Sequence, residues 1–587
     1  MRIGLVQIEN FRGIKSLHWE PQAGVNCLIG PGDSGKTTIL DAVELVLSSR
    51  HTIAFSDLDF FGGGHKHTIA ITVTLVDLPD EFISNQYYGL YLRGFLNDHT
   101  LVDEPPLPED GQPALSIRLT VDESLEGKWI LFNDRVAAEH KETSLSFADR
   151  LKVAPARLGI YADRHLSWGR YSTLTKLSEG NAGTKDVLAQ VGRLARGHFK
   201  AEAAGLFQKS LEDVTLAANK VGMALPANLS AGLDVSNLSI GSGSIAIHGD
   251  DIPLRVMGLG SSRLLVAALQ DHSRVSACLT IIDEVEHGLE PYRISRLLKH
   301  LKSKDRASPQ VFITSHSPVV IRELKVGDLH VVRRAADGKV KVTVANQQFA
   351  RRDPQAPPRS MPEAYLAPSI LFCEGKTEVG LIRGMDDVWC AQRMDSLALK
   401  GVALADGGGV DNAPALAGQF HMLGYDVGLL IDSDKEPDDA EILEKLKAKG
   451  IPIFRWRVGY ATEDMLFHDL PLKAVETLFD YALEIVGDQS LLAAVNKGQT
   501  PNDQFTTIDE VRAKLAEKAV LDALAARAKG KKRKNKDGDD TIHEAWFKDM
   551  DKADRIARDV LGPHLAQAKD ELKTTMSAIR AWVDDRS

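Results

Sequence analysis

The chain has 587 residues, which is too long for a single hydrophobic core and predicts roughly two to four domains. Hydrophobic residues make up 43% and charged residues 26%, as in soluble globular proteins. Its apolar runs stay well below the ~18 residues of a membrane helix, and Glu9 breaks the N-terminal stretch that would form a signal peptide. We therefore expect a cytoplasmic protein without a membrane partner.

The net charge of −10 does not indicate binding to nucleic acid, although whole-chain charge says little about any one surface. The cysteines show no CxxC spacing, so we expect reduced thiols and no zinc site. They are Cys27, Cys278, Cys373 and Cys390.

The first 80 residues alternate between strand-like and helical patterns. Strands are expected at about 3–11, 24–29 and 68–78, and a helix at 36–47. The apolar residues of that helix recur at a period of 3.6, which is typical of a helix that covers a sheet. The N-terminal part is therefore expected to be an α/β domain.

A glycine-rich loop stands between the second strand and the helix. The segment GPGDSGKT fits the G-x-x-x-x-G-K-[ST] pattern, in which backbone N–H groups wrap phosphate, the lysine neutralises phosphate charge and the threonine ligates Mg²⁺. We predict an ATP site with contacts from Gly30, Asp33, Ser34, Gly35, Lys36, Thr37 and Thr38.

Two later strand ends add candidates for the same site. Asp283 is expected to hold Mg²⁺ and Glu284 to orient or deprotonate water, although an acid pair after a strand also serves as a turn or helix cap. His316 ends a further strand and is suited to sense a γ-phosphate, although a lone histidine there is often structural.

The order of these motifs, with the segment Gly258 to Ser262 between them, resembles the ABC-type ATPase heads of SMC and RecF-like proteins. The resemblance implies that Ser261 and the following helix cap the ATP of a partner head, so that ATP closes a dimer. The signature is not a full LSGGQ, and the usual Q-loop glutamine is not evident. ATP binding is therefore more secure than rapid hydrolysis.

Two segments divide the chain further. Residues 184–222 show helical periodicity without strong breakers, which predicts a helical insert at about 165–235. Five prolines between 351 and 368 predict a linker at 350–367. The stretches around 369–373, 402–409, 427–434 and 451–458 then alternate with helical patterns, as in a mostly parallel sheet.

Acids follow the strands of this second domain. Carboxylates after parallel strands converge at one sheet edge and repel one another unless Mg²⁺ or Mn²⁺ binds. The predicted ligands are Glu374, Glu378, Asp432, Asp434 and Glu463. Helix capping is the alternative for Glu378, Asp434 or Glu463 taken singly. Lys548, or failing that Lys552, would neutralise the transition state, although surface lysines are common.

This pattern resembles the Toprim domain of topoisomerases, primases and some nucleases. The resemblance implies a two-metal site that cleaves phosphodiesters, with Glu374, Asp432, Asp434 and Lys548 in catalysis. The basic run from Lys529 to Lys536 could contact DNA backbone, but we expect a solvated loop there.

An ABC-type head with a helical insert (1–349), a linker (350–367) and a Toprim domain with a helical extension (368–587) together resemble the OLD (overcoming lysogenization defect) family. That family implies metal-dependent DNA cleavage or nicking controlled by ATP, typically in anti-phage defence. It also implies a homo-dimer or higher homo-oligomer formed through the ATPase half, and leaves open whether a helicase acts with it. The alternative is a RecF-like DNA clamp whose Toprim domain is only a scaffold.

Overall fold

The computed structural model describes residues 1–587 except 51–52, 65, 85, 139–141, most of 159–183, 204, most of 221–244, 250–251, 273–278, 303–309, 346–352, 440, 498–499, 501–503, 531, 535–539, 543–544 and 587. The chain forms two compact units, Met1–Cys27 with Thr37–Ser315, and Leu28–Lys36 with His316–Ser587. No helix in the described part of the chain has the length and apolar character needed to cross a bilayer.

The first unit contains antiparallel strands and a short parallel group. Strand β1 pairs with β2 and β4, β4 with β7, and β7 with β5 and β8, while β12 lies parallel between β9 and β13. The strands are β1 Arg2–Phe11, β2 Ile14–Trp19, β4 Ile69–Val76, β5 Arg93–Leu96, β6 Leu101–Val102, β7 Gly111–Val121, β8 Gly127–Phe132, β9 Ala156–Leu158, β10 His248–Gly249, β11 Ile252–Pro253, β12 Leu279–Ile282 and β13 Gln310–Thr314.

The helices of this unit include the expected insert. They are α2 Asp80–Ile83, α3 Asp134–Ala138, α4 Phe147–Val153, α6 Thr184–Ala203, α7 Gln208–Lys220, α8 Leu259–His272 and α9 Pro291–Leu301. Helices α6 and α7 confirm the helical pattern predicted at 184–222. Strand β3 (Val25–Ile29) and helix α1 (Lys36–Leu47) flank the glycine loop at the expected positions.

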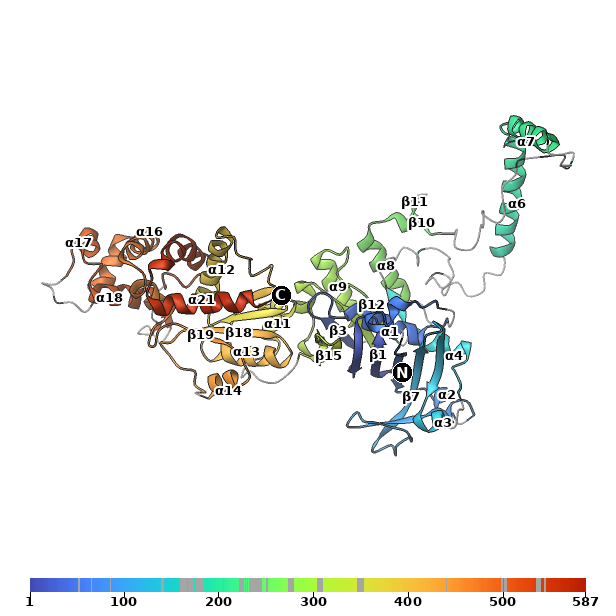
Figure 1. Cartoon of the computed structure of the whole chain (residues 1–587), viewed down its shortest axis with the longest axis horizontal. Coiled ribbons are helices and arrows are strands. Elements are labelled where there is room, and N and C mark those ends of the chain that lie inside the picture. Colours follow the sequence, from blue (N-terminus) through green and yellow to red (C-terminus); the bar gives the residue numbers. More distant parts are fainter. Residues whose placement is uncertain are drawn as a thin grey trace. The chain divides into compact units, whose positions relative to one another are not determined.

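The second unit is organised around a four-stranded parallel sheet of order β17-β16-β18-β19. Strand β16 and most of β18 are buried apolar runs, as strands covered on both faces require. Helices α12 and α21 lie on one side of the sheet and α13 and α14 on the other (Figure 1). The strands are β16 Ser369–Cys373, β17 Val402–Asp406, β18 Asp426–Ile431 and β19 Ile453–Arg455. The predicted parallel sheet is confirmed.

The other elements of this unit precede, connect or follow the strands of the sheet. They are α10 Pro318–Glu323, β14 Leu329–Arg334, β15 Lys339–Val344, α11 Ala356–Ser360, α12 Lys376–Ala391, α13 Asn412–Met422, α14 Ile442–Ala448, α15 Thr462–His468, α16 Leu472–Val495, α17 Ile508–Ala513, α18 Lys518–Ala528, β20 Lys532–Lys534, β21 Asp540–Ile542, α19 Met550–Ile556, α20 Gly562–His564 and α21 Asp570–Asp584.

Two features differ from the expectations. The described part of the proline-rich linker is a packed segment, because Pro357, Pro358 and Tyr365 are buried and Tyr425 Oη donates to the Tyr365 carbonyl at 2.7 Å. The basic run is not a simple loop, since Lys532–Lys534 pairs with Asp540–Ile542 as an antiparallel hairpin. Lys531 and Lys536 lie outside the described residues.

Close helix packing positions the segment that carries Lys548. A Cβ on Gly380 would stand 2.2 Å from the Met550 carbonyl oxygen, and one on Gly384 the same distance from that of Asp554. These two glycines, one turn apart on α12, therefore let the backbone of α19 approach closely. Lys548 directly precedes Asp549, the N-cap of that helix, and follows the buried pair Trp546 and Phe547.

Candidate functional site

The glycine loop has the geometry of a phosphate cradle. Gly30 has φ +142°, and a Cβ there would stand 2.6 Å from the Val332 carbonyl oxygen, so only glycine fits. Gly32 has open space around it. Lys36 is buried, and its Nζ donates to the Pro31 carbonyl at 2.7 Å and the Gly30 carbonyl at 3.2 Å. The ammonium is thus held over the loop where a phosphate would lie.

The threonine and the strand-end acid predicted to hold Mg²⁺ are in contact. Thr37 Oγ1 donates to Asp283 Oδ1 at 3.2 Å, and Thr314 Oγ1 donates to the same oxygen at 2.5 Å. Asp283 is 7% exposed, whereas Glu284 is half-buried and has φ +45°. The Glu284 amide donates to Thr314 Oγ1 at 2.8 Å, which fixes the turn that presents this acid.

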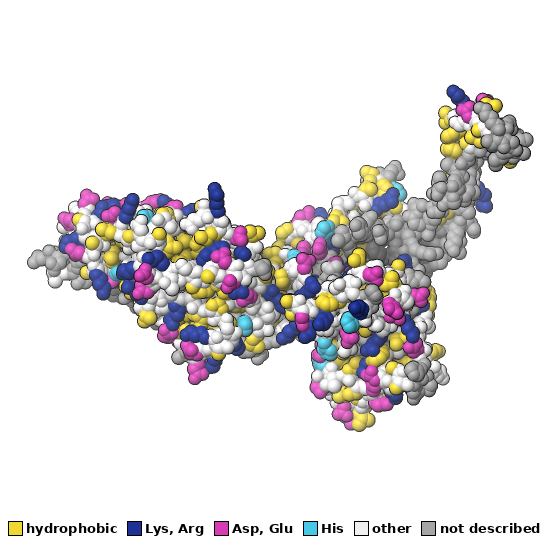
Figure 2. All heavy atoms as spheres, in the orientation of Figure 1, with side chains coloured by type: hydrophobic (Ala, Val, Ile, Leu, Met, Phe, Trp, Pro, Cys, Tyr) yellow, Lys and Arg dark blue, Asp and Glu magenta, His cyan; other side chains and the backbone are white. Residues whose placement is uncertain are grey.

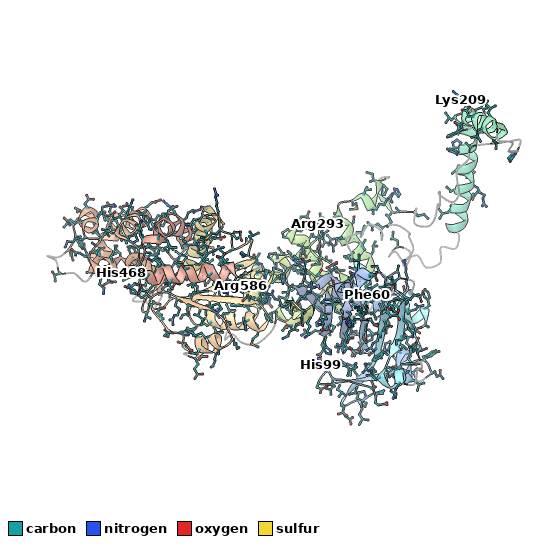
Figure 3. All side chains as sticks on the ribbon, in the orientation of Figure 1. Phe60, His99, Lys209, Arg293, His468 and Arg586 are labelled. Carbon is teal, nitrogen blue, oxygen red and sulfur yellow. The ribbon has the colours of Figure 1, made fainter. Side chains whose placement is uncertain are left out.

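The glycine-serine segment begins helix α8 as expected. A Cβ on Gly260 would stand 2.1 Å from the Gly288 carbonyl oxygen, so the helix start packs tightly on the turn after Asp283. Ser261 Oγ accepts a hydrogen bond of 3.0 Å from Arg293 of α9, labelled in Figure 3. Strand β13 ends at Thr314, and Ser315 and then the exposed His316 follow it.

The second unit contains a cavity of about 530 Å³ at the carboxyl edge of its parallel sheet. Its lining includes four of the five predicted acids and the predicted lysine, namely Glu374, Asp432, Asp434, Glu463 and Lys548. Lys552 and Glu378 are not among the lining residues. Since β16 and β18 are neighbours in register, their following residues meet, and the Asp432 amide donates to Glu374 Oε2 at 3.0 Å.

Glu378 lies behind this cavity and is 4% exposed. Its Oε2 accepts from the Gly375 amide at 2.8 Å, which is the helix-capping role left open by the sequence. Its Oε1 accepts from Thr462 Oγ1 at 2.6 Å, and the same hydroxyl lies 3.0 Å from Asp432 Oδ1. Glu378 is therefore both a cap and a member of the acid cluster.

Burial and the neighbouring carboxylates shift the pKa values of these acids. Burial, together with the charges of Glu378, Glu374 and Glu463, raises the pKa of Asp432 to about 9. Burial and the charge of Glu378 raise the pKa of Glu463 to about 7. Burial also raises the pKa of Glu374 and of Glu378. Without a cation, part of this cluster holds protons at neutral pH.

The donor set fits a hard divalent cation. Glu463 is 2% exposed, and its Oε1 is a buried oxygen for which the described residues supply no hydrogen-bond donor. No three histidine, cysteine or acid side chains among the described residues already form a metal cage. Mg²⁺ usually keeps several waters and takes one or two carboxylates, which a roomy cavity permits.

Several residues of these sites escaped the sequence analysis. Thr462 directly precedes Glu463. The one signal in the sequence for its role is a hydroxyl side chain next to a predicted metal ligand. Lys529 was considered only as part of the basic run, yet it lines the cavity and pairs with Asp464. Arg157 of β9 donates to Asp41 Oδ1 at 2.7 Å and lies 3.6 Å from Asp283 Oδ2, a contact that no local pattern signals.

The surface charge is mixed. Acidic and basic side chains are interspersed on the visible face of the second unit in Figure 2. The net charge therefore says little about which ligands approach the cavity, where Lys435, Lys529 and Lys548 stand among the acids.

Known proteins match the N-terminal half. A family model described as "AAA domain, putative AbiEii toxin, Type IV TA system" matches residues 25–322, just over half of the chain. The DNA replication and repair protein RecF of Chlorobium luteolum is 46% identical over 93 residues, 16% of this chain and 23% of that protein. The DNA double-strand break repair Rad50 ATPase of Methanopyrus kandleri is 38% identical over 77 residues, 11% of this chain and 9% of that protein. The chain thus spans less than a quarter of the length of either relative.

Solved structures of SMC heads are also similar to this chain, but with lower sequence identity. The SmcHead bound to the C-winged helix domain of ScpA has 15% identity and a TM-score of 0.33, with 58% of this chain and 98% of that chain covered. The SMC head domain from Thermotoga maritima has 15% identity and a TM-score of 0.29, with 59% and 99% covered. These values are too low to add to the assignment.

The family match spans the glycine loop, the Thr37–Asp283 contact and His316. The chain belongs to the family described as "AAA domain, putative AbiEii toxin, Type IV TA system", and its N-terminal half is an ATP-binding ATPase domain.

Proposed function

We propose that the chain is a divalent-metal-dependent DNA nuclease of the OLD type, with a Toprim domain in its C-terminal part and cleavage controlled by ATP. The observation that carries the proposal is the cavity in which Glu374, Asp432 and Glu463 lie with raised pKa values beside Lys548. Perturbed acids gathered in a cavity are typical of functional sites and costly for stability.

The proposed cation ligands are Glu374, Glu378, Asp432, Asp434 and Glu463. A bound Mg²⁺ or Mn²⁺ supplies Lewis-acid activation of water and stabilisation of the leaving oxygen. Lys548 would contact a phosphate oxygen and neutralise charge that develops on it. Lys529, tied to Asp464 on the wall of the cavity, would hold a neighbouring phosphate of the same strand.

Cleavage of supercoiled plasmid in Mg²⁺ or Mn²⁺ tests this function. Parent protein is expected to nick or cut the plasmid, and Asp432→Ala to lose at least about 100-fold of that activity. Glu444→Gln is the matched control, because Glu444 is 73% exposed on α14 and pairs with Lys447 across the surface of its own helix. If Asp432→Ala cuts as well as the parent, the nuclease assignment is wrong.

Control by ATP is a separate proposal. It is supported by the membership of one compact unit, because the second unit contains the phosphate loop Leu28–Lys36, the exposed His316 and the acid cavity. ATP titrated into the plasmid assay should change the cleavage rate of the parent but not of Lys36→Ala. Cleavage by the parent that ignores ATP removes this part of the proposal.

Self-association is proposed through the ATPase half, residues 1–349, and its helical insert. The Toprim domain is proposed to span residues 368–587. Val187, Val191 and Leu194 are exposed at helical spacing on α6, as expected of a surface that a second copy covers. Light scattering of the parent and of a Val191→Asp, Leu194→Asp double variant checks this. Equal masses for both proteins would contradict it.

The second candidate function is a RecF-like DNA-binding ATPase clamp. The local matches to RecF and Rad50 favour it, because those proteins are named for DNA repair. It predicts ATP-dependent DNA binding without cleavage in either metal, so the plasmid assay separates the two functions.

A further inference from the structure

Thr462 stands at the centre of the acid cluster. It is fully buried, it begins α15, and it directly precedes Glu463. The far end of this helix is marked by His468 in Figure 3. The backbone amide of Thr462 donates to Asp432 Oδ1 at 3.2 Å, and the Thr462 hydroxyl lies 2.6 Å from Glu378 Oε1.

The direction of the hydroxyl proton follows from a third neighbour. Trp456 Nε1 donates to Thr462 Oγ1 at 2.8 Å and so occupies one of its acceptor positions. The hydroxyl has one proton, and the Glu378 oxygen at 2.6 Å is nearer than the Asp432 oxygen at 3.0 Å. The hydroxyl therefore serves Glu378, and the amide serves Asp432.

The two acids come from different elements. Glu378 is on α12 and Asp432 follows β18, and their like charges repel in a buried setting. Without the hydroxyl, Glu378 would keep the Gly375 amide but lose its bond across the cluster. A carboxylate that loses this donor is no longer held in place relative to Asp432, and its displacement weakens it as a ligand.

We propose that Thr462, oriented by Trp456, is a positioning residue that holds Glu378 and Asp432 at a fixed separation for a divalent cation. This inference rests on the proposed function, since it assumes that these acids are cation ligands. Groups that hydrogen-bond to metal ligands commonly change metal affinity by about 10- to 100-fold.

Mn²⁺ binding to the full-length chain at pH 8, measured by calorimetry, tests the proposal. Thr462→Val keeps the side-chain shape and removes the hydroxyl, and it should weaken Mn²⁺ binding about 10-fold. Thr462→Ser restores a hydroxyl and should stay within about two-fold of the parent. Thr477→Val is the matched control, because Thr477 is exposed and its hydroxyl donates to the Lys473 carbonyl of its own helix.

A folding defect is separated by a second variant. Trp456→Phe leaves Thr462 intact and removes the Nε1 donor that orients its hydroxyl, together with part of the buried ring system, so a smaller loss of Mn²⁺ affinity, about three-fold, is expected. In the plasmid assay, the Mn²⁺ concentration for half-maximal cleavage should rise in Thr462→Val, with less change in the rate at saturating Mn²⁺.

The outcomes distinguish this proposal from the nuclease proposal. Equal Mn²⁺ affinity in Thr462→Val, Thr462→Ser and parent overturns the role of Thr462, whether or not the parent cleaves DNA. Weakened binding in Thr462→Val alone, with a parent that does not cleave, supports Thr462 and overturns the nuclease. A parent that binds no Mn²⁺ overturns both.

Discussion

The phosphate loop and the acid cavity balance their charges in opposite ways. The Lys36 ammonium donates to the carbonyl oxygens of Gly30 and Pro31, so a cation stands where an anion would bind. The carboxylates of the cavity are buried and also meet one another, and both effects raise the pKa of Asp432 and of Glu463. The first site presents a cation to an anionic ligand, whereas the second stores repulsion that a cation or a proton relieves.

The largest expected effect concerns the ammonium group of Lys548 in the acid cavity. Lys548→Gln should reduce plasmid cleavage about 100-fold, because it removes the charge proposed to offset that on the reacting phosphate. Lys552→Gln, four residues later and outside the cavity lining, should stay within about two-fold. Initial cleavage rates at saturating Mn²⁺ measure both. Equal losses in the two variants would contradict the assignment of Lys548.

The next effect concerns stability and pH in the metal-free protein. Because the folded pKa of Asp432 is about 9, well above its ordinary value of 3.8, its contribution to stability is fully present below pH 3.8 and is lost as pH rises towards 9. Asp432→Asn lacks this dependence and should be more stable than the parent at pH 8 by on the order of 2 kcal/mol.

Denaturant unfolding in EDTA at pH 5 and pH 8 checks this expectation. The advantage of Asp432→Asn should shrink at pH 5, because the free energy that the unfolded state gains by ionising this carboxyl falls as the pH approaches its ordinary pKa of 3.8. An Asp432→Asn protein that is less stable than the parent at pH 8 would show that the cavity stores no such repulsion.

The smallest expected effect concerns the phosphate loop. Gly30→Ala should lower the unfolding free energy by about 1–2 kcal/mol, because alanine is strained at φ +142° and its Cβ would meet the Val332 carbonyl. Gly32→Ala has open space and should change it by less than about 0.5 kcal/mol. Equal losses in thermal or denaturant unfolding would contradict the close approach at Gly30.

Local patterns in the sequence were sufficient for much of this architecture. The phosphate loop, helix α1 and the parallel strands of the second unit follow from periodicity and glycine spacing, and the strand-end rule brought Glu374 and Asp432 together. The packed segment around Tyr365 was missed, because proline content indicates a chain break but not what buries it. Thr462 and Arg157 were missed because their roles depend on partners far away in the chain.

The central claim is that the acids of the cavity are held for a divalent cation. Its most direct test is the number of protons released when Mn²⁺ binds at pH 7, obtained by calorimetry in buffers of different ionisation enthalpy. Because burial and neighbouring carboxylates raise the pKa of Asp432 to about 9 and that of Glu463 to about 7, we expect release of about one proton or more per Mn²⁺ bound, and less in Asp432→Asn. Binding without proton release, or no Mn²⁺ binding, would contradict it.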